Sequence, residues 1–223
     1  MKLEKEGESL SVPIYSDEFI EAAEKAFDCA NNGVSEFYPW KKPDTPTDFN
    51  IGVIVGSSGS GKSTLLKNFG KEDQPKWNEV KSIISHFETP DEAINLLTAV
   101  GLNSVPSWYK PYHVLSNGEK FRADLARKVK DGAVIDEFTS VVDRNVAKAA
   151  SVALVRYIKK NNIKNVVLST CHRDILEWLE PDWIIDTDLG EYTEGFFLLD
   201  QKLKSRFIEQ IKVSGECLRT ITI

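Results

Sequence analysis

Eight consecutive residues match the phosphate-binding pattern GxxxxGK[ST] in full: Gly56-Ser57-Ser58-Gly59-Ser60-Gly61-Lys62-Ser63. The glycines let backbone N–H groups point inward around phosphate oxygens, and the start of a following helix adds partial positive charge. Lys62 would reach the β- and γ-phosphates, and the Ser63 hydroxyl would ligate Mg²⁺. The alternative is a flexible turn, but a chance match in this chain has a probability on the order of 1%. These residues and Thr64 therefore predict a nucleotide site.

Two acids, Asp136 and Glu137, directly follow the apolar residues Ala133-Val134-Ile135. Asp136 suits a magnesium-supporting role at the end of a neighbouring strand. Glu137, one residue further and facing differently, could polarise a water for attack on a γ-phosphate. Such a pair taken alone is more often a solvated turn. The phosphate loop and the preceding apolar run favour a functional role here.

Apolar runs typical of buried strands alternate with helical patterns along the chain. We expect strands at 51–55, 133–135, 166–168, 184–185 and 196–199. We expect helices directly after the phosphate loop and over 91–100, 118–130 and 143–160. This alternation predicts an α/β fold with a largely parallel sheet, whose ligands sit at the carboxyl ends of the strands.

The region before the first buried strand has a different composition. Its first ten or so residues alternate Lys and Glu, and we expect them to fray. Ser16 could cap a helix that runs to about Ala30. Pro39, Pro43 and Pro46 then mark an extended connector that cannot be helical.

Further motifs resemble those of the ATP-binding cassette (ABC) ATPases. Leu115-Ser116-Asn117-Gly118-Glu119 resembles the LSGGQ signature, with Asn117 for the first glycine and Glu119 for the glutamine. Ser140-Val141-Val142-Asp143 resembles the family's D-loop, and His172 resembles its switch histidine. With the phosphate loop and the acids, five elements stand in the family's order over about half of the chain.

The resemblance implies an ABC-type P-loop NTPase fold, mainly a parallel sheet with a short helical subdomain at about 88–130. It implies a single domain, 1–223, in which 1–48 is an N-terminal extension. It also implies that two ATP molecules, each with Mg²⁺, are sandwiched in a head-to-tail homodimer. Ser116, Asn117, Gly118 and Glu119 would then bind the nucleotide held by the opposite subunit. Asp143 would couple the two sites, His172 would contact the γ-phosphate, and Glu137 would be the base.

The sequence departs from the family at the position that is usually a glutamine contacting Mg²⁺. Residues 83–87 occupy that place, and His86 either replaces the glutamine as a metal ligand or has a structural role; Gln74 is the other candidate. The aromatic residue that stacks on adenine is also open, because Tyr38, Trp40 and Phe49 all precede the phosphate loop. Phe138 stands where the family commonly has proline.

Composition narrows the functional class. Twenty-eight basic and 34 acidic residues give a net charge of −6, which argues against a protein that mainly coats duplex DNA. The three widely spaced cysteines suit a reducing compartment, and no apolar run approaches a membrane span. These features predict a cytoplasmic chain that is not inserted in a membrane. The basic residues at 120–130 are either a nucleic-acid-binding face of a dimer or solvated charges, and we favour the latter.

We therefore expect an ATP hydrolase whose cycle drives a soluble protein partner or a nucleic-acid-related process. The chain resembles a small soluble cassette group, associated with acetyltransferase-like domains and also found in phages, in the segments SVPSW at 104–108, LSNGEKFR, DEFTSVVDR and CHRDILEWLEPDW. The short insert between His86 and Ser116 is typical of cassettes that do not dock on membrane subunits. The alternative is the nucleotide-binding subunit of an ABC transporter whose membrane subunits are separate chains.

Overall fold

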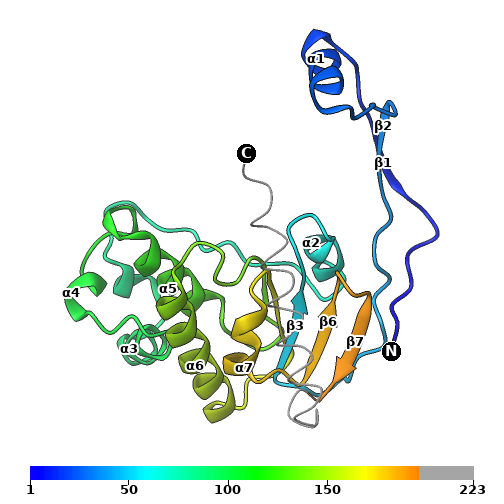
Figure 1. Cartoon of the computed structure of the whole chain (residues 1–223). Helices are drawn as coiled ribbons and strands as arrows, with labels where there is room; N and C mark the ends of the chain where they lie inside the picture. Colours follow the sequence, from blue (N-terminus) through cyan, green and yellow to red (C-terminus); the bar gives the residue numbers. More distant parts are fainter. Residues whose placement is uncertain (196–223) are drawn as a thin grey trace.

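The computed structural model describes residues 1–195, and its centre is a five-stranded sheet (Figure 1). The strands are β3 Ile51–Val55, β4 Val134–Ile135, β5 Val166–Thr170, β6 Trp183–Asp186 and β7 Glu191–Glu194. They lie in the order β4-β5-β3-β6-β7, in which the first four are parallel and β7 is antiparallel to β6. The predicted α/β fold with a mainly parallel sheet is confirmed. The strand expected at 196–199 lies outside the described residues.

Strand β3 forms the middle of the sheet because all five of its residues are apolar or glycine and all are buried. Alternate side chains enter two different cores: Val53 and Val55 pack on one face of the sheet and Ile54 on the other. Gly52 is required by a close approach, since a Cβ there would lie 2.0 Å from the Trp183 ring. The Trp183 indole of β6 thus packs directly over Gly52 of the neighbouring strand β3.

Helices cover both faces of the sheet. They are α2 Lys62–Leu66, α3 Pro90–Ala99, α4 Val105–Trp108, α5 Asn117–Lys128, α6 Arg144–Lys160 and α7 Leu176–Leu179, with 3₁₀ turns η1 Ile83–His86, η2 Tyr112–Val114 and η3 Arg173–Ile175. The larger core joins the sheet to α3, α5 and α6, and the smaller one lies under α2. Residues 83–86, which occupy the place of the family's glutamine, form the 3₁₀ turn η1, and Phe87 follows in extended backbone.

The first residues do not fray, contrary to expectation, because their backbone pairs with the edge of the sheet. The Leu3 N–H donates to the Gly190 carbonyl over 2.8 Å, and the Tyr192 N–H donates to the Met1 carbonyl over 2.8 Å. The Glu6 N–H then donates to Pro39, which lies in the extended connector. The N-terminus therefore extends the sheet beyond β7 and ties down the connector.

Residues 8–38, called the arm from here on, project away from the rest of the molecule (Figure 1). Strands β1 Leu10–Pro13 and β2 Val34–Phe37 pair antiparallel, and helix α1 Glu18–Phe27 lies between them in sequence. The helix is capped by Asp17 rather than by Ser16, and its last turn is closed by Asp28 in the left-handed conformation. Both ends thus differ slightly from the predicted boundaries.

Candidate functional site

The phosphate-loop residues connect β3 to α2 and border a pocket of about 290 Å³. Residues from four separate segments line it: Phe37, Ser58, Gly59, Gly61, Lys62, Ser63, Thr64, Glu137, Ser140 and Cys171. The Lys62 ammonium donates to the Ser57 carbonyl across the loop, over 2.6 Å. The structure therefore brings the phosphate loop and Glu137 to the same pocket, and Asp136 is not among the described residues that line it.

Gly61 enforces the sharp entry into α2, because its φ of 95° lies in the left-handed region that favours glycine. A Cβ at Gly61 would lie 2.4 Å from the Phe37 ring. Phe37 is thus an aromatic residue at the pocket that the sequence analysis missed. Of the three aromatics considered there, Phe49 is buried in the smaller core, and the Trp40 indole N–H donates to the Ser60 carbonyl over 3.1 Å.

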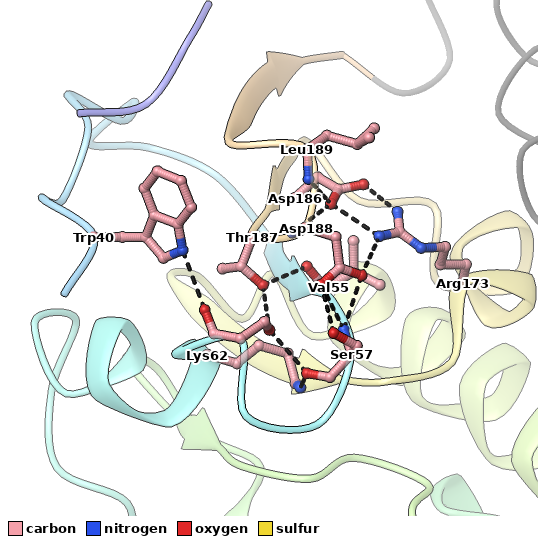
Figure 2. Close-up of polar contacts among 10 residues, drawn as sticks. Trp40, Val55, Ser57, Lys62, Arg173, Asp186, Thr187, Asp188 and Leu189 are labelled. Carbon is pink, nitrogen blue, oxygen red and sulfur yellow. Dashed lines mark hydrogen bonds and ion pairs between the residues drawn. The ribbon is translucent and has the colours of Figure 1, made fainter. Parts of the chain in front are cut away.

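A network of charged side chains from η3 and from the end of β6 contacts Ser57 of the phosphate loop (Figure 2). The Ser57 hydroxyl donates to the Asp188 carboxylate over 2.7 Å, and the Ser57 N–H donates to it over 2.9 Å. Arg173 forms an ion pair with Asp188 over 2.8 Å and a second one with Asp186. The side chain of Asp186 is only 2% exposed, so this pair is largely desolvated.

Asp188 and Arg173 hold each other in their charged forms. Burial acts to raise the pKa of Asp188, but hydrogen bonds from Ser57 and the Arg173 charge outweigh it, and the pKa is lowered. Burial acts to lower the pKa of Arg173, and the bonds to Asp186 and Asp188 raise it overall. The network therefore ties the segment after His172 to the first turn of the phosphate loop.

The two acids after β4 stand on a strained stretch of backbone. Glu137 has a φ of 51° and Thr139 a φ of 69°, both unusual for residues with a side chain. The buried Phe138 between them anchors the stretch, and its N–H donates to the Ser169 carbonyl over 2.8 Å. The Ser169 hydroxyl donates to Asp136 and accepts from the Glu137 N–H. This geometry directs Glu137 towards the phosphate loop.

His172 follows β5 at the same edge of the sheet. Its Nδ1 is hydrogen-bonded to the Thr139 hydroxyl over 3.0 Å, which links it to the strained stretch beside Glu137. Burial, and then the charge of Arg144, lower the pKa of His172, while Asp174 opposes them. The lowered pKa favours the neutral imidazole near pH 7. Among the described residues that line the phosphate-loop pocket is its neighbour Cys171, and His172 is not one of them.

The signature-like residues begin helix α5. The Ser116 hydroxyl accepts from the Glu119 N–H, and Glu119 accepts from the Ser116 N–H over 2.8 Å, which is a capping box. The Ser107 hydroxyl also donates to Glu119, and these bonds lower the pKa of Glu119 to about 2. Glu119 thus shapes the helix start and fixes α4 against it. Within the described chain, the signature-like residues do not line the phosphate-loop pocket of their own subunit.

Comparisons with solved structures bear on the arrangement of these elements. The chain matches the dimeric structure of MJ0796, a bacterial ABC transporter cassette, at 14% identity and a TM-score of 0.53, over 72% of this chain and 92% of that one. It also matches the dimeric post-hydrolysis state of MJ0796 bound to ADP and Pi, at 15% identity and a TM-score of 0.55, over 86% and 97%. The fold is that of an ATP-binding cassette. The chain matches no protein-family model and none of the curated proteins.

In this cassette fold, Asp143 caps the helix after the strained stretch. Its Oδ1 accepts from the Asn145 N–H over 2.9 Å and from the Val146 N–H over 3.1 Å. This satisfies two amides at the start of α6 and holds the D-loop-like residues 140–143 in place.

The structure favours the structural role for His86. Its Nε2 accepts from the Asn78 N–H and its Nδ1 donates to the Ser82 carbonyl, each over 2.9 Å. The ring also packs edge-on against Trp77. Both nitrogens are thus engaged by backbone, and among the described residues His86 is not one that lines the phosphate-loop pocket of the cassette.

Three of the basic residues at 120–130 have partners within the cassette. Lys128 forms a half-buried ion pair with Glu72 over 2.7 Å, and Lys130 pairs with Asp73. Arg127 donates to the Lys76 carbonyl and lies over the Trp77 ring. These three residues are thus engaged within the chain rather than fully solvated, which differs from the favoured expectation of solvated charges. Among residues 1–195 there is no helix long and apolar enough to cross a membrane.

Proposed function

We propose that the chain is an ABC-type ATPase that binds and hydrolyses Mg·ATP. The observation that carries the proposal is the common pocket of the phosphate loop and Glu137, which come from chain segments some 75 residues apart. A glycine-rich loop that begins a helix binds phosphates, and a carboxylate beside it supplies the base that hydrolysis needs. The fold of an ATP-binding cassette supports the same assignment.

Each residue has a role that its position suits. The loop N–H groups and Lys62 bind and neutralise the phosphates of ATP. Glu137 accepts a proton from the attacking water, and the neutral His172 donates a hydrogen bond from Nε2 to the γ-phosphate. For Nε2 to carry the proton, the Nδ1 of His172 accepts its hydrogen bond from the Thr139 hydroxyl. Phe37 is placed to stack on the base.

The residues at the site also fit a magnesium ion. Ser63 and Asp136 offer hydroxyl and carboxylate oxygens, the hard donors that Mg²⁺ prefers. When bound, the ion would neutralise charge on the β- and γ-phosphates. The Ser169 hydroxyl, which donates to Asp136, would orient that carboxylate. We leave His86 outside this site because its two ring nitrogens already bond to backbone.

The position of the signature supports a head-to-tail dimer. Ser116, Asn117 and Gly118 begin a helix whose free N–H groups suit an anion, yet they do not line their own subunit's pocket. In a head-to-tail dimer they would close over the ATP of the other subunit. The similarity to cassettes whose structures are described as dimeric supports this pairing.

The test is the variant Glu137→Gln, assayed for phosphate release and for nucleotide binding. We expect turnover to fall by at least about 100-fold, because the base is lost, with nucleotide affinity changed less than about threefold. Glu177→Gln, on the exposed face of α7, is the matched control and should behave as the parent. Unchanged turnover in Glu137→Gln would remove that carboxylate from the mechanism. Tight binding without hydrolysis in the parent would contradict the enzyme assignment.

We further propose that the cycle drives a soluble protein partner or a nucleic-acid-related process. The short helical segment between His86 and Ser116 supports this over a membrane-docked role. The test is an affinity pull-down with Glu137→Gln held in Mg·ATP, with wild type in Mg·ADP as the control. A soluble transferase or nucleic-acid-processing enzyme retained only with ATP would support the proposal. Retention of a protein with several membrane spans would instead identify a transporter subunit.

A further inference from the structure

Helix α1 of the arm carries an apolar stripe that no described residue covers. Phe19, Ile20, Ala23 and Phe27 share one face of the helix by their spacing, and none of the residues of α1 is buried. Phe19 is 76% exposed and Phe27 is 81% exposed. A single two-stranded hairpin such as β1–β2 is at best marginally stable alone in water. These features indicate a surface built to pack against something else.

The charge of the arm restricts what that partner can be. Residues 8–38 contain seven acidic side chains and a single lysine, Lys25. By helical spacing Glu24 adjoins the apolar stripe, and Glu18 and Glu21 lie on the other side of the same helix. A surface that receives the arm therefore needs exposed apolar side chains together with positive charge and few acids.

One surface of this same chain has those properties. From residue 93 to residue 118 there is no acidic side chain. Within that segment Tyr109 is 65% exposed and Val114 is 53% exposed, and the exposed residues Lys110 and His113 lie between them. We call these four residues the patch. The patch directly precedes Ser116, and the Ser107 hydroxyl bonds to Glu119, so it is fixed to the start of α5.

An arm cannot reach the patch of its own subunit. The arm lies at one end of the molecule, beyond β7 and α2, whereas α4 and the start of α5 lie at the other (Figure 1). The base of the arm is fixed at the phosphate loop, where Phe37 lies against Gly61 and Trp40 bonds to Ser60. Arm and patch are thus complementary surfaces at opposite ends of one chain, which is the arrangement that a two-fold head-to-tail pair can close.

We propose that the arm of each subunit docks on the patch of a second copy of this chain. The inference rests on the proposed function, because head-to-tail pairing brings the signature of one subunit, and with it the patch, to the phosphate loop of the other. Each dimer then holds two identical arm–patch contacts. Since Phe37 belongs to both the arm and the nucleotide pocket, the contact also reports whether a nucleotide is bound.

The first experiment measures the dissociation constant of the dimer in the Glu137→Gln background with saturating Mg·ATP, by analytical ultracentrifugation. We expect the arm variant Phe19→Ser/Phe27→Ser to dimerise at least tenfold more weakly than its parent. The affinity of the monomeric arm variant for a fluorescent ATP analogue should stay within twofold of the affinity of its parent. Val80→Ser, which removes an apolar side chain that is 85% exposed outside the arm and patch, is the control and should dimerise as the parent.

A mixing experiment tests whether the contact is between arm and patch. Tyr109→Ser/Val114→Ser should weaken the homodimer as the arm variant does. A mixture of the two variants restores one intact contact, from the arm of one protein to the patch of the other. The heterodimer should therefore be tighter than either homodimer. If mixing gives no gain, the arm and the patch do not meet.

The possible outcomes separate this inference from the proposed function. An arm variant that hydrolyses ATP and dimerises as Val80→Ser does would overturn the docking and leave the ATPase assignment standing. A parent that hydrolyses ATP but stays monomeric would overturn the docking and the pairing. Hydrogen exchange gives a third readout, in which the amides of α1 become protected only in the ATP dimer. Equal protection in the nucleotide-free monomer would mean that the chain covers its own stripe.

Discussion

At the scale of residues, burial is the main cause that lowers the pKa of His172, and two nearby charges add to it and oppose it. Arg144 lowers the pKa of His172 and Asp174 raises it, while the two form an ion pair with each other over 2.9 Å. Replacing Arg144 by glutamine removes the first effect and leaves the second unopposed. We expect the pKa of His172 to start below its ordinary value and to rise in Arg144→Gln, by an amount that solvent screening of the exposed charges keeps small.

The measurement is an NMR titration of the imidazole C–H signals in the nucleotide-free protein. The chain has three histidines, so His86 and His113 serve as internal references. Arg156→Gln, on the exposed face of α6, is the control, and in it the His172 signal should change over the same pH range as in the parent. Since a lowered pKa keeps the neutral form down to a lower pH, the parent's signal should move at lower pH than the variant's. The opposite order would contradict the contact with Arg144.

Residues that lie close together in the sequence were the predictable part of the site. The phosphate loop is a contiguous pattern, and the Asp136-Glu137 pair follows an apolar run. The support of the loop by Asp188 was not predictable, because Ser57 and Asp188 are 131 positions apart. The available signal was the acid Asp186 at the end of the apolar run 183–185. Phe37 was missed because it belongs to the arm, whose strands are short and exposed.

At the scale of elements, the pair between Arg173 and Asp186 fixes the end of β6 to the turn η3. Asp186 also accepts the N–H groups of Asp188 and Leu189, each over 3.0 Å. Asp186→Asn would leave the buried Arg173 charge with Asp188 alone. We expect a loss of about 3 kcal/mol in the free energy of unfolding, measured with urea, because breaking a desolvated ion pair leaves an uncompensated charge.

The matched control is Asp174→Asn, which breaks the pair with Arg144. That pair has side chains 55% and 39% exposed, so its loss should cost at most about 1 kcal/mol. Similar losses in the two variants would show that the Arg173 pair is not desolvated in solution. The comparison therefore isolates burial, since both substitutions change the same chemical group.

The helices with a long periodic pattern and the buried apolar strands 51–55, 134–135, 166–170 and 183–186 were predicted within a few residues. Helix α6 has a continuous apolar stripe over 17 residues. Asp143, a residue type that caps helices, stands directly before it in the sequence and caps it in the structure. Residues 83–86 have the composition of a strand but close into a 3₁₀ turn. The Ile83 N–H bonds to the Lys110 carbonyl, so the segment pairs with the chain before η2. Such a tertiary bond decides the conformation of a short segment and leaves no local trace.

At the scale of the whole molecule, alternation of strands and helices was enough to predict the α/β fold, because burial of both sheet faces requires apolar runs. The prediction that the first residues fray was wrong, because it was based on side-chain composition alone. Lys and Glu side chains suit a solvated end, yet the backbone of residues 1–3 pairs with the exposed edge at β7, and residues 4–5 pair with the connector at 40–41. Backbone pairing of an edge strand places few demands on side chains, and composition therefore does not reveal it.

The final prediction concerns how nucleotide changes the stability of the whole chain. A ligand that binds only the folded state at 100 times its dissociation constant adds about 2.7 kcal/mol, which for a chain of this size raises Tm by roughly 5–10 °C. If ATP also drives pairing, the Tm of Glu137→Gln in excess Mg·ATP should rise further with protein concentration, because association is linked to folding in the same way. With Mg·ADP, the Tm should be independent of protein concentration. Lys62→Ala, which removes the ammonium that contacts the phosphates, should lose both shifts. A Tm that rises with ATP but does not respond to protein concentration would mean that one subunit binds and encloses its nucleotide alone.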